Sequence, residues 1–244
     1  MLQTYKTTLT EKVPFTHDVF HLKFVLDEPK ELCFIPGQYM IMRVPPDSLP
    51  RLYSIASAPD QKNSFELIMK IEPFGKASTY VQNSQVGDQF VFQGPAGVFR
   101  LKDTPNGKIF LATSCGIAPM RSMLLSIIEN REVPHYYLFW GLPTYKDVYL
   151  FDEIKNLKSQ IKNFDFRICL SREQNLGIVP EEDRQYFALG HVDDCIEEAI
   201  HNSQFVMDNS EFYLCGSRHV TESLKIYLLT QKQVSPSQVV FEKF

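Results

Sequence analysis

The sequence predicts two domains, an N-terminal antiparallel β-barrel followed by a C-terminal α/β domain built on a parallel sheet. The first observation is a series of short β-rich runs, broken by turn residues, that continues to about residue 103. The second is the segment Asp103-Thr104-Pro105-Asn106-Gly107, the strongest break in the chain. The third is a regular alternation of strand and helix patterns beyond that break. We therefore place the domains at residues 1–103 and 104–244.

The barrel half consists of short runs rich in β-branched and aromatic residues, separated by turn signals such as Pro36-Gly37 and Gly87-Asp88. One brief helix is expected at 77–83. The predicted strands cover residues 5–10, 19–26, 38–44, 52–57, 65–72 and 89–93. Short strands at this spacing are typical of an antiparallel barrel or sandwich.

The second half alternates between strand and helix patterns, which indicates a parallel sheet with helices on both faces. The predicted strands cover residues 108–113, 135–140, 164–170, 211–215 and 239–241. The predicted helices cover residues 117–129, 147–159, 192–202 and 221–230. Ligands of such sheets bind beyond the carboxyl ends of the strands.

Composition excludes several classes of protein. The net charge of −4 argues against a nucleic-acid partner, which requires a basic face. No apolar run approaches the roughly 18 residues of a membrane helix, so we expect no membrane insertion and a cytoplasmic location. The five cysteines are scattered, which fits reduced thiols and excludes the close cysteine spacing of a ferredoxin-type cluster. The histidines show no metal-ligand spacing, so no metal is expected.

Two segments of the barrel half carry residues suited to a phosphate-bearing aromatic ligand. In a strand, Arg51 and Tyr53 share a face and Ser54 points across, so a cation, an aromatic ring and a hydroxyl are available together. Gly75-Lys76-Ala77-Ser78-Thr79 then opens the short helix, where backbone amides and two hydroxyls favour an anion. Taken alone, the first segment could be an ordinary half-exposed strand and Ser78 a simple helix cap.

The second domain opens with a strand that runs directly into a helix through small residues, from Thr113 to Gly116. Pro119 stands in the first turn of that helix, where proline is tolerated. The amides and the dipole of such a helix start suit a pyrophosphate.

In their order, these motifs resemble those of the ferredoxin–NADP⁺ reductase family. The chain reads R-x-Y-S, G-x-x-S, G-P-x-G, G-I-A-P, C-G and a terminal E-x-aromatic, from Arg51 to Phe244. The resemblance implies an FAD-binding barrel and an NAD(P)-binding α/β domain, without an iron–sulfur domain. It also implies that a hydride passes from NADPH to flavin N5 and that electrons then pass to an acceptor protein such as ferredoxin or flavodoxin.

The resemblance assigns the flavin site residue by residue. Arg51 would contact the FAD pyrophosphate, Tyr53 would stack on the isoalloxazine, and the Ser54 hydroxyl would lie near N5. Gly75, Lys76, Ala77 and Ser78 would hold the pyrophosphate. Glu242 would relay protons, and Phe244 would cover the flavin as a displaceable lid.

The resemblance assigns the coenzyme site in the same way. Thr113 and Gly116 match the loop under the nicotinamide nucleotide, and Cys215 is the small residue against its ring. Ser171, Arg172, Arg184 and Tyr186 match the residues around a 2′-phosphate and the adenine, so NADPH is expected to be preferred over NADH. NADH remains open, because Arg172 could simply pair with Glu173 or a nearby loop.

Two departures from the family pattern stand out. Ser114-Cys115-Gly116 replaces the usual G-T-G, and a serine at a glycine position restricts the backbone and crowds the pyrophosphate. The chain reads Phe244 where plant-type members have tyrosine. Trp140 and His219 match no family motif and are expected to pack in the core.

Three other functions stay open at this level. The chain could reduce free flavin as a substrate, or serve as an electron-transfer subunit of a larger complex. The missing cysteine cluster at its end counts against the subunit hypothesis. A flavin-binding module without catalysis is the third.

Overall fold

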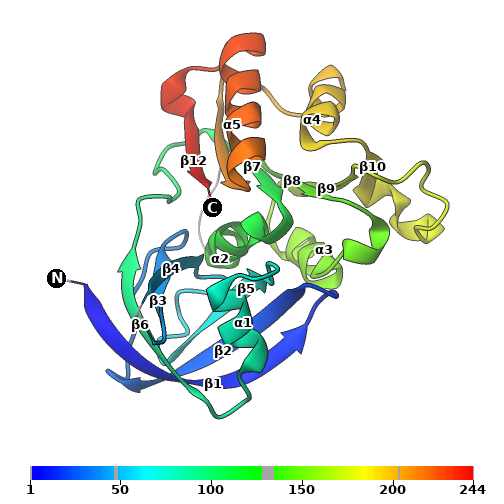
Figure 1. Cartoon of the computed structure of the whole chain (residues 1–244). Coiled ribbons are helices and arrows are strands. Elements are labelled where there is room, and N and C mark those ends of the chain that lie inside the picture. The colour runs from blue at the N-terminus through cyan, green and yellow to red at the C-terminus, as the bar shows by residue number, and fades with distance from the viewer. Residues whose placement is uncertain (1, 47–48, 128–134, 203, 244) are drawn as a thin grey trace. The chain divides into compact units, whose positions relative to one another are not determined.

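The computed structural model describes residues 2–46, 49–127, 135–202 and 204–243 (Figure 1). These residues fold into two compact units, each with its own sheet. The first unit comprises Met1–Leu101 and Ala118–Ser126, and the second comprises Lys102–Ile117 and Ile127–Phe244. None of the helices in the described ranges combines the length and the hydrophobicity that a membrane crossing requires.

Within its described residues, the first unit holds a six-stranded antiparallel sheet in the order β4-β3-β6-β1-β2-β5. The strands are β1 (Gln3–Pro14), β2 (Val19–Glu28), β3 (Tyr39–Val44), β4 (Leu49–Ser54), β5 (Ser64–Lys70) and β6 (Gln89–Ala96), and the helix α1 is Lys76–Asn83. The sheet curls until its two edges meet at the bridge between Ile55 and Leu67. The predicted antiparallel barrel is therefore confirmed.

Side chains that alternate along the strands fill the barrel interior. Phe24 lies at its centre, with ring centroids of Phe65, Phe90 and Phe92 between 4.9 and 5.4 Å away. All four rings are 2 % exposed or less. The strand predicted at 52–57 was misplaced: β4 begins at Leu49 and ends at Ser54, so residues 55–57 lie outside it, because the chain leaves β3 there to bridge β5.

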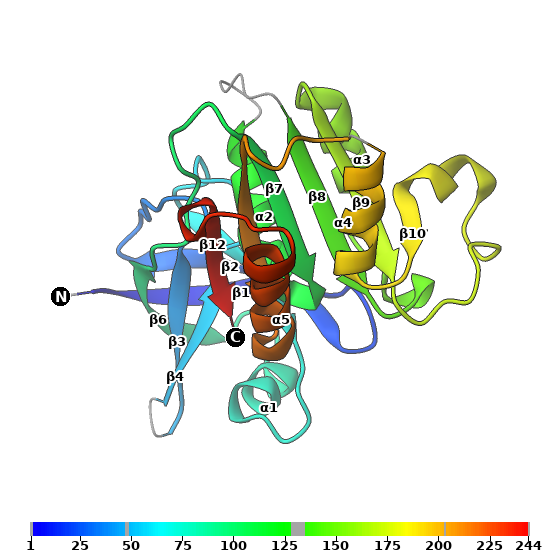
Figure 2. The ribbon, with the colours of Figure 1, turned by 90° about the horizontal axis from the view of Figure 1, so that it is seen from above.

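The described part of the second unit forms a parallel sheet in the order β10-β9-β8-β7-β11-β12 (Figure 2). The strands are β7 (Gly107–Thr113), β8 (Tyr136–Leu142), β9 (Phe164–Leu170), β10 (Phe187–Leu189), β11 (Ser210–Gly216) and β12 (Val239–Lys243). Helices α4 (Val192–His201) and α5 (Arg218–Ile226) cover one face, and α3 (Phe151–Gln160) covers the other. This arrangement confirms the predicted parallel-sheet domain.

The order of the strands contains one reversal. The chain adds β8, β9 and β10 outward on one side of β7, and then returns to place β11 on the other side. In open α/β sheets such a switch point leaves a crevice at the carboxyl ends of the two central strands, and ligands bind there. The carboxyl ends of β7 and β11 are therefore the first place to look for a ligand site in this unit.

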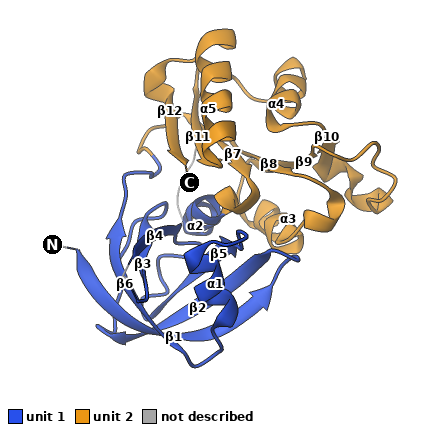
Figure 3. Cartoon of the chain, viewed as in Figure 1, with its two compact units in different colours: residues 1–101, 118–126 blue, residues 102–117, 127–244 orange. Residues whose placement is uncertain are grey.

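Three helical details differ from the sequence prediction. Helix α3 begins at Phe151 and not at 147, because Leu150 has a φ of 55° and interrupts the helical backbone. Helix α5 begins at Arg218 and runs into a π-helical turn at Tyr227–Gln231. Helix α2 (Ile117–Ile127) is divided between the units, since Ala118–Ser126 belongs to the first (Figure 3). The domain boundary after residue 103 stays a prediction.

A buried ion pair anchors the amino ends of the central strands of the second unit. The Lys108 Nζ donates to Glu211 Oε2 at 2.7 Å, and Tyr213 and Thr104 donate to the same carboxylate. Lys108 and Glu211 are 1 % and 3 % exposed. Burial raises the pKa of the Glu211 carboxyl, but the hydrogen bonds from Lys108, Tyr213 and Thr104 outweigh it and lower the pKa. The pair lies at the end of the sheet opposite the switch-point crevice.

Candidate functional site

Strand β4 presents the first group of predicted site residues. Its register pairs Arg51 with Met42, Tyr53 with Met40, and Ser54 with Tyr39. Arg51 is exposed, and its Nη1 donates to the carbonyl of Pro50 at 2.8 Å. Tyr53 and Ser54 are partly buried, and Tyr53 packs against the barrel core. A cation, an aromatic ring and a hydroxyl therefore lie along one short strand at the edge of the barrel.

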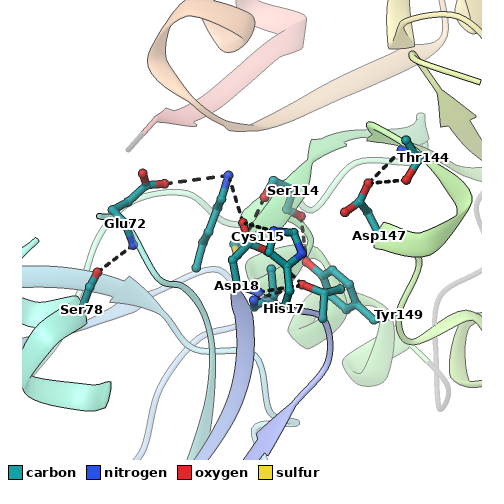
Figure 4. Close-up of polar contacts among 12 residues, drawn as sticks. His17, Asp18, Glu72, Ser78, Ser114, Cys115, Thr144, Asp147 and Tyr149 are labelled. Atoms are coloured by element: carbon teal, nitrogen blue, oxygen red, sulfur yellow. Dashed lines mark hydrogen bonds and ion pairs between the residues drawn. The ribbon is translucent and has the colours of Figure 1, made fainter. Parts of the chain in front are cut away.

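The loop before α1 is the second group, and Ser78 organises it. Glu72 N–H donates to Ser78 Oγ at 2.9 Å, and Gly75 N–H donates to the carbonyl of Glu72 at 3.1 Å (Figure 4). The N-cap residue of α1 is Gly75 and Ser78 lies inside the helix, so the helix-cap alternative was wrong. Gly75 precedes α1, where a Cβ would lie 3.0 Å from Ser78 Oγ. Ala77 is buried in the barrel core and Lys76 is exposed.

A partly buried ionic cluster, formed by His21, Glu66 and Arg121, was not identified by sequence reasoning. The Arg121 Nη1 donates to Glu66 Oε2 at 2.7 Å and to the carbonyl of Ala56 at 2.8 Å, and His21 Nε2 lies 3.2 Å from the same carboxylate oxygen. Burial raises the pKa of Glu66, but the hydrogen bond from His21 and the Arg121 guanidinium outweigh it and hold the pKa at about 2. Ala56 N–H also donates to the carbonyl of Glu66. The cluster fixes the chain just after the R-x-Y-S segment.

At the switch point of the second unit, the loop after β7 and the end of β11 meet at two glycines. A Cβ on Gly116 would come within 2.0 Å of the carbonyl oxygen of Cys215, and one on Gly216 within 2.0 Å of Thr113 Oγ1. A side chain at Gly116 would have to move the backbone of β11, and one at Gly216 would have to displace the Thr113 hydroxyl. The glycines therefore let the loop after β7 and the end of β11 dock directly on each other. Thr113, Gly116 and Cys215 therefore lie close together at this edge of the sheet.

Strand β12 adds a carboxylate to this edge. Glu242 is the register partner of Cys215 and is partly buried. Burial raises the pKa of the Cys215 thiol well above its usual value, and the Glu242 carboxylate raises it further. Cys215 is therefore a small neutral side chain and not a thiolate nucleophile. Phe244 lies outside the described residues, so its predicted lid role stays a prediction.

The serine at the glycine position of the loop adopts the backbone conformation that glycine favours. Ser114 has a φ of 49°. Its carbonyl accepts hydrogen bonds from Trp140 Nε1 at 3.0 Å and from the Tyr149 hydroxyl at 3.1 Å, and Figure 4 shows Tyr149 directed at Ser114. Trp140 is fully buried, as expected for core packing, whereas His219 is exposed, so the core role predicted for His219 was wrong.

The four residues proposed for the 2′-phosphate do not lie together. Ser171 and Arg172 directly follow the carboxyl end of β9, and Arg172 is exposed. Tyr186 instead precedes β10 and stacks on Phe166 with a centroid distance of 4.8 Å. Phe166 stands four residues before the end of β9, which is about 13 Å along a strand.

Arg184 belongs to the same short helix, Glu181–Tyr186, as Tyr186. The Arg184 Nε donates to the carbonyl of Val179 at 3.1 Å, and Lys155 lies 5.6 Å from the centroid of the Tyr186 ring. The resemblance implied one cluster, but the Tyr186 ring stacks within the span of β9, whereas Ser171 and Arg172 follow the end of that strand.

Comparison with known proteins gives matches over both halves of the chain. Residues 6–101 match the family model "Oxidoreductase FAD-binding domain", and residues 110–225 match "Oxidoreductase NAD-binding domain". The chain is 30% identical over 248 residues to the reductase component of propane 2-monooxygenase from Mycolicibacterium smegmatis, covering 100% of this chain and 68% of that protein. It is 26% identical over 238 residues to the anthranilate 1,2-dioxygenase electron transfer component from Acinetobacter baylyi, covering 97% of this chain and 65% of that protein.

Among solved structures, the ferredoxin–NADP⁺ reductase from Plasmodium falciparum superposes with a TM-score of 0.76. The superposition covers 98% of this chain and 95% of that chain at 19% identity, so it shows a shared fold. The chain spans about two thirds of the length of the two curated relatives. The family matches cover the sheets that carry the R-x-Y-S strand and the switch-point glycines. The chain belongs to the ferredoxin–NADP⁺ reductase family of FAD- and nicotinamide-dependent oxidoreductases.

Proposed function

We propose that this protein is an FAD-containing reductase that oxidises NADPH and passes electrons to a separate acceptor protein, such as a ferredoxin, a flavodoxin or an oxygenase component. The observation that carries the proposal is the close approach of Gly116 to the backbone of Cys215 and of Gly216 to the Thr113 hydroxyl at the switch point. With glycine at both positions, a dinucleotide can approach the backbone closely at this edge of the sheet. The names of the relatives, reductase and electron transfer components, support a protein acceptor.

The barrel residues fit a flavin dinucleotide. The exposed Arg51 guanidinium can form paired, charge-assisted hydrogen bonds with a pyrophosphate, and the turn closed by Ser78 can hold its other side with Gly75, Lys76 and Ala77. The partly buried Tyr53 offers a ring face, and the Ser54 hydroxyl can donate to a ring nitrogen. When bound, FAD would accept a hydride at N5 and release electrons singly or in pairs.

The second unit would bind the nicotinamide coenzyme. Thr113, Gly116 and the neutral Cys215 would line the nucleotide at the switch point. Glu242, on the neighbouring strand, would hold and move a proton at its carboxylate. The terminal Phe244 would cover the flavin face that the nicotinamide must reach, as a lid whose stacking energy is small enough to be displaced at each turnover.

We propose that NADPH is preferred over NADH, and Ser171 and Arg172 carry this preference. Both follow the carboxyl end of β9, where the adenosine half of a dinucleotide lies in folds of this type. A guanidinium at that edge can pair with a 2′-phosphate. Arg184 and Tyr186 were predicted to complete this pocket. Arg184 instead donates to the carbonyl of Val179 and Tyr186 stacks on Phe166, so the structure gives less support to their part in binding the 2′-phosphate and the adenine.

We also place the protein in the cytoplasm. The five cysteines all lie within the described ranges and form no disulfide there, which suits a reducing compartment.

The acceptor and the bound flavin can be tested on one preparation. Flavin released by denaturation should be FAD at about one per chain, and the intact protein should reduce a ferredoxin, a flavodoxin or an oxygenase component faster than it reduces free FMN. The matched variant Arg51→Ala should lower FAD retention, and His219→Ala, on an exposed position outside the site, should not. Loose flavin together with rapid reduction of free FMN would favour a free-flavin reductase instead.

A further inference from the structure

The loop that replaces the usual G-T-G with Ser114-Cys115-Gly116 is held by two aromatic donors from another part of the sheet. The Ser114 carbonyl accepts the Trp140 indole N–H at 3.0 Å and the Tyr149 hydroxyl at 3.1 Å. Trp140 is 0 % exposed and Tyr149 6 %. Their rings meet edge to face with centroids 4.7 Å apart, so each ring holds the other in place.

These hydrogen bonds act on a strained residue. Ser114 has a φ of 49°, a region in which residues with a Cβ are disfavoured. Such a conformation persists only where surrounding contacts determine it. The contacts that act on this peptide come from donors buried in the second unit and therefore shielded from competing water.

The orientation of one carbonyl fixes the orientation of the next amide. In a planar trans peptide the C=O and the following N–H point in opposite directions. Holding the Ser114 carbonyl toward Trp140 and Tyr149 therefore directs the Cys115 N–H to the opposite side of that peptide. A flipped peptide would present a carbonyl oxygen on that side, and an oxygen repels a phosphate.

Tyr149 is itself placed by a capped turn after β8. Thr144 N–H and Thr144 Oγ1 donate to Asp147 Oδ2 at 2.9 and 2.7 Å, and Val148 N–H donates to the carbonyl of Tyr145 (Figure 4). The turn ends directly before Tyr149, whose ring lies against Trp140. Hydrogen bonds within the Thr144 turn position Tyr149, and Tyr149 in turn donates to the Ser114 carbonyl.

We propose that Trp140 and Tyr149 are positioning residues for coenzyme binding, which hold the Ser114–Cys115 peptide in the orientation that receives the pyrophosphate of the nicotinamide dinucleotide. This inference rests on the proposed function, since it takes the switch-point loop as the coenzyme site. It explains how a serine serves at a position where relatives of this fold use glycine. The two hydrogen bonds from Trp140 and Tyr149 to the Ser114 carbonyl, which we call the clamp, hold the serine in the conformation that glycine would adopt without strain.

The test is a titration of the purified holoenzyme with NADP⁺, followed by the change in flavin absorbance. Tyr149→Phe removes one hydroxyl and keeps the ring, so the FAD content should stay unchanged while the dissociation constant for NADP⁺ rises about three- to tenfold. Ser114→Gly removes the strain, so Tyr149→Phe added to Ser114→Gly should change the dissociation constant less than twofold. This rescue is a result that general loosening of the core would not give.

Tyr213→Phe is the matched control. It also removes a buried tyrosine hydroxyl from the same sheet, one that donates to Glu211 and accepts from Lys102 N–H at the other end of the strands. It should lower the melting temperature and leave the dissociation constant for NADP⁺ unchanged.

The outcomes separate the inference from the proposed function. Binding of NADP⁺ that is equally tight in the wild type and in Tyr149→Phe would overturn the clamp alone. So would equal weakening by Tyr149→Phe in the serine and glycine backgrounds. A wild-type holoenzyme that binds neither NADP⁺ nor NAD⁺ would overturn the proposed function, and the clamp with it.

Discussion

Replacing Gly116 with alanine should disrupt the switch point more than any other single methyl group. The added Cβ would lie 2.0 Å from the carbonyl oxygen of Cys215, 2.5 Å from its carbonyl carbon and 2.9 Å from Gly216 N. All three atoms belong to the backbone of β11, so no side-chain rotation can relieve the contact. The loop and the strand end must separate by roughly 1.4 Å to restore an ordinary contact.

The size of the effect follows from that displacement. Forcing an extra methyl group into a packed interior costs about 1–3 kcal/mol. For a protein of this size, each kcal/mol corresponds to about 2–4 °C in melting temperature, so we expect a decrease of about 2–12 °C. A displacement of about 1 Å at a reacting centre can also cost up to about 100-fold in rate, so flavin reduction by NADPH should slow markedly.

Thermal unfolding followed by circular dichroism and stopped-flow flavin reduction measure the two effects. Gly87→Ala is the control, since its φ is +102° but no atom lies within 4 Å of the added Cβ. It should show the backbone strain of alanine in that conformation without any loss of coenzyme affinity. If Gly116→Ala kept both the wild-type melting temperature and the wild-type reduction rate, the close approach of β7 and β11 inferred here would be wrong.

Four further outcomes are expected. The Glu66 carboxyl has a pKa of about 2 instead of about 4.5, so it contributes stability above pH 4.5 that is lost as the pH falls toward 2; urea unfolding at several pH values should show this loss in the wild type and not in Glu66→Gln. Glu211→Gln leaves the Lys108 ammonium buried without its carboxylate and should cost about 3–5 kcal/mol in urea unfolding, much of it recovered in the Lys108→Met/Glu211→Leu double variant. Arg172→Ala should lower kcat/KM for NADPH about tenfold and leave that for NADH unchanged, and equal losses for both coenzymes would contradict the 2′-phosphate role. Ser54→Ala should slow flavin reduction before it lowers FAD content, because the hydroxyl acts on an atom whose charge changes during reaction.

Local patterns were sufficient to predict the two sheets. Alternation along each strand and the change of pattern after Gly107 depend on residues close in sequence, and the structure confirms the antiparallel barrel and the parallel sheet. The loop at Thr113–Gly116 was also identifiable, since a strand, small residues and a helix follow one another without interruption. These features are fixed by the nearest neighbours along the chain.

Other features depend on contacts between distant residues, and no local pattern contains them. The β10 strand has three residues and pairs only with β9, so it was missed. Closure of the barrel depends on the pairing of Ile55 with Leu67.

The candidate site shows the same limit. Trp140 and Tyr149 lie 26 and 35 residues after Ser114, and their hydrogen bonds to it could not be inferred from spacing. The resemblance placed Tyr186 near the adenine beside Arg172, whereas in the structure its ring stacks on Phe166.

The transfer of a hydride from the nicotinamide to the bound flavin is the central claim, and a deuterium isotope effect on flavin reduction tests it most directly. The holoenzyme would be mixed without oxygen with NADPH, and separately with NADPH deuterated at C4 on the transferred face. We expect the flavin absorbance to bleach in both cases, and more slowly with the deuterated coenzyme. A flavin that stays oxidised with both NADPH and NADH would contradict the account.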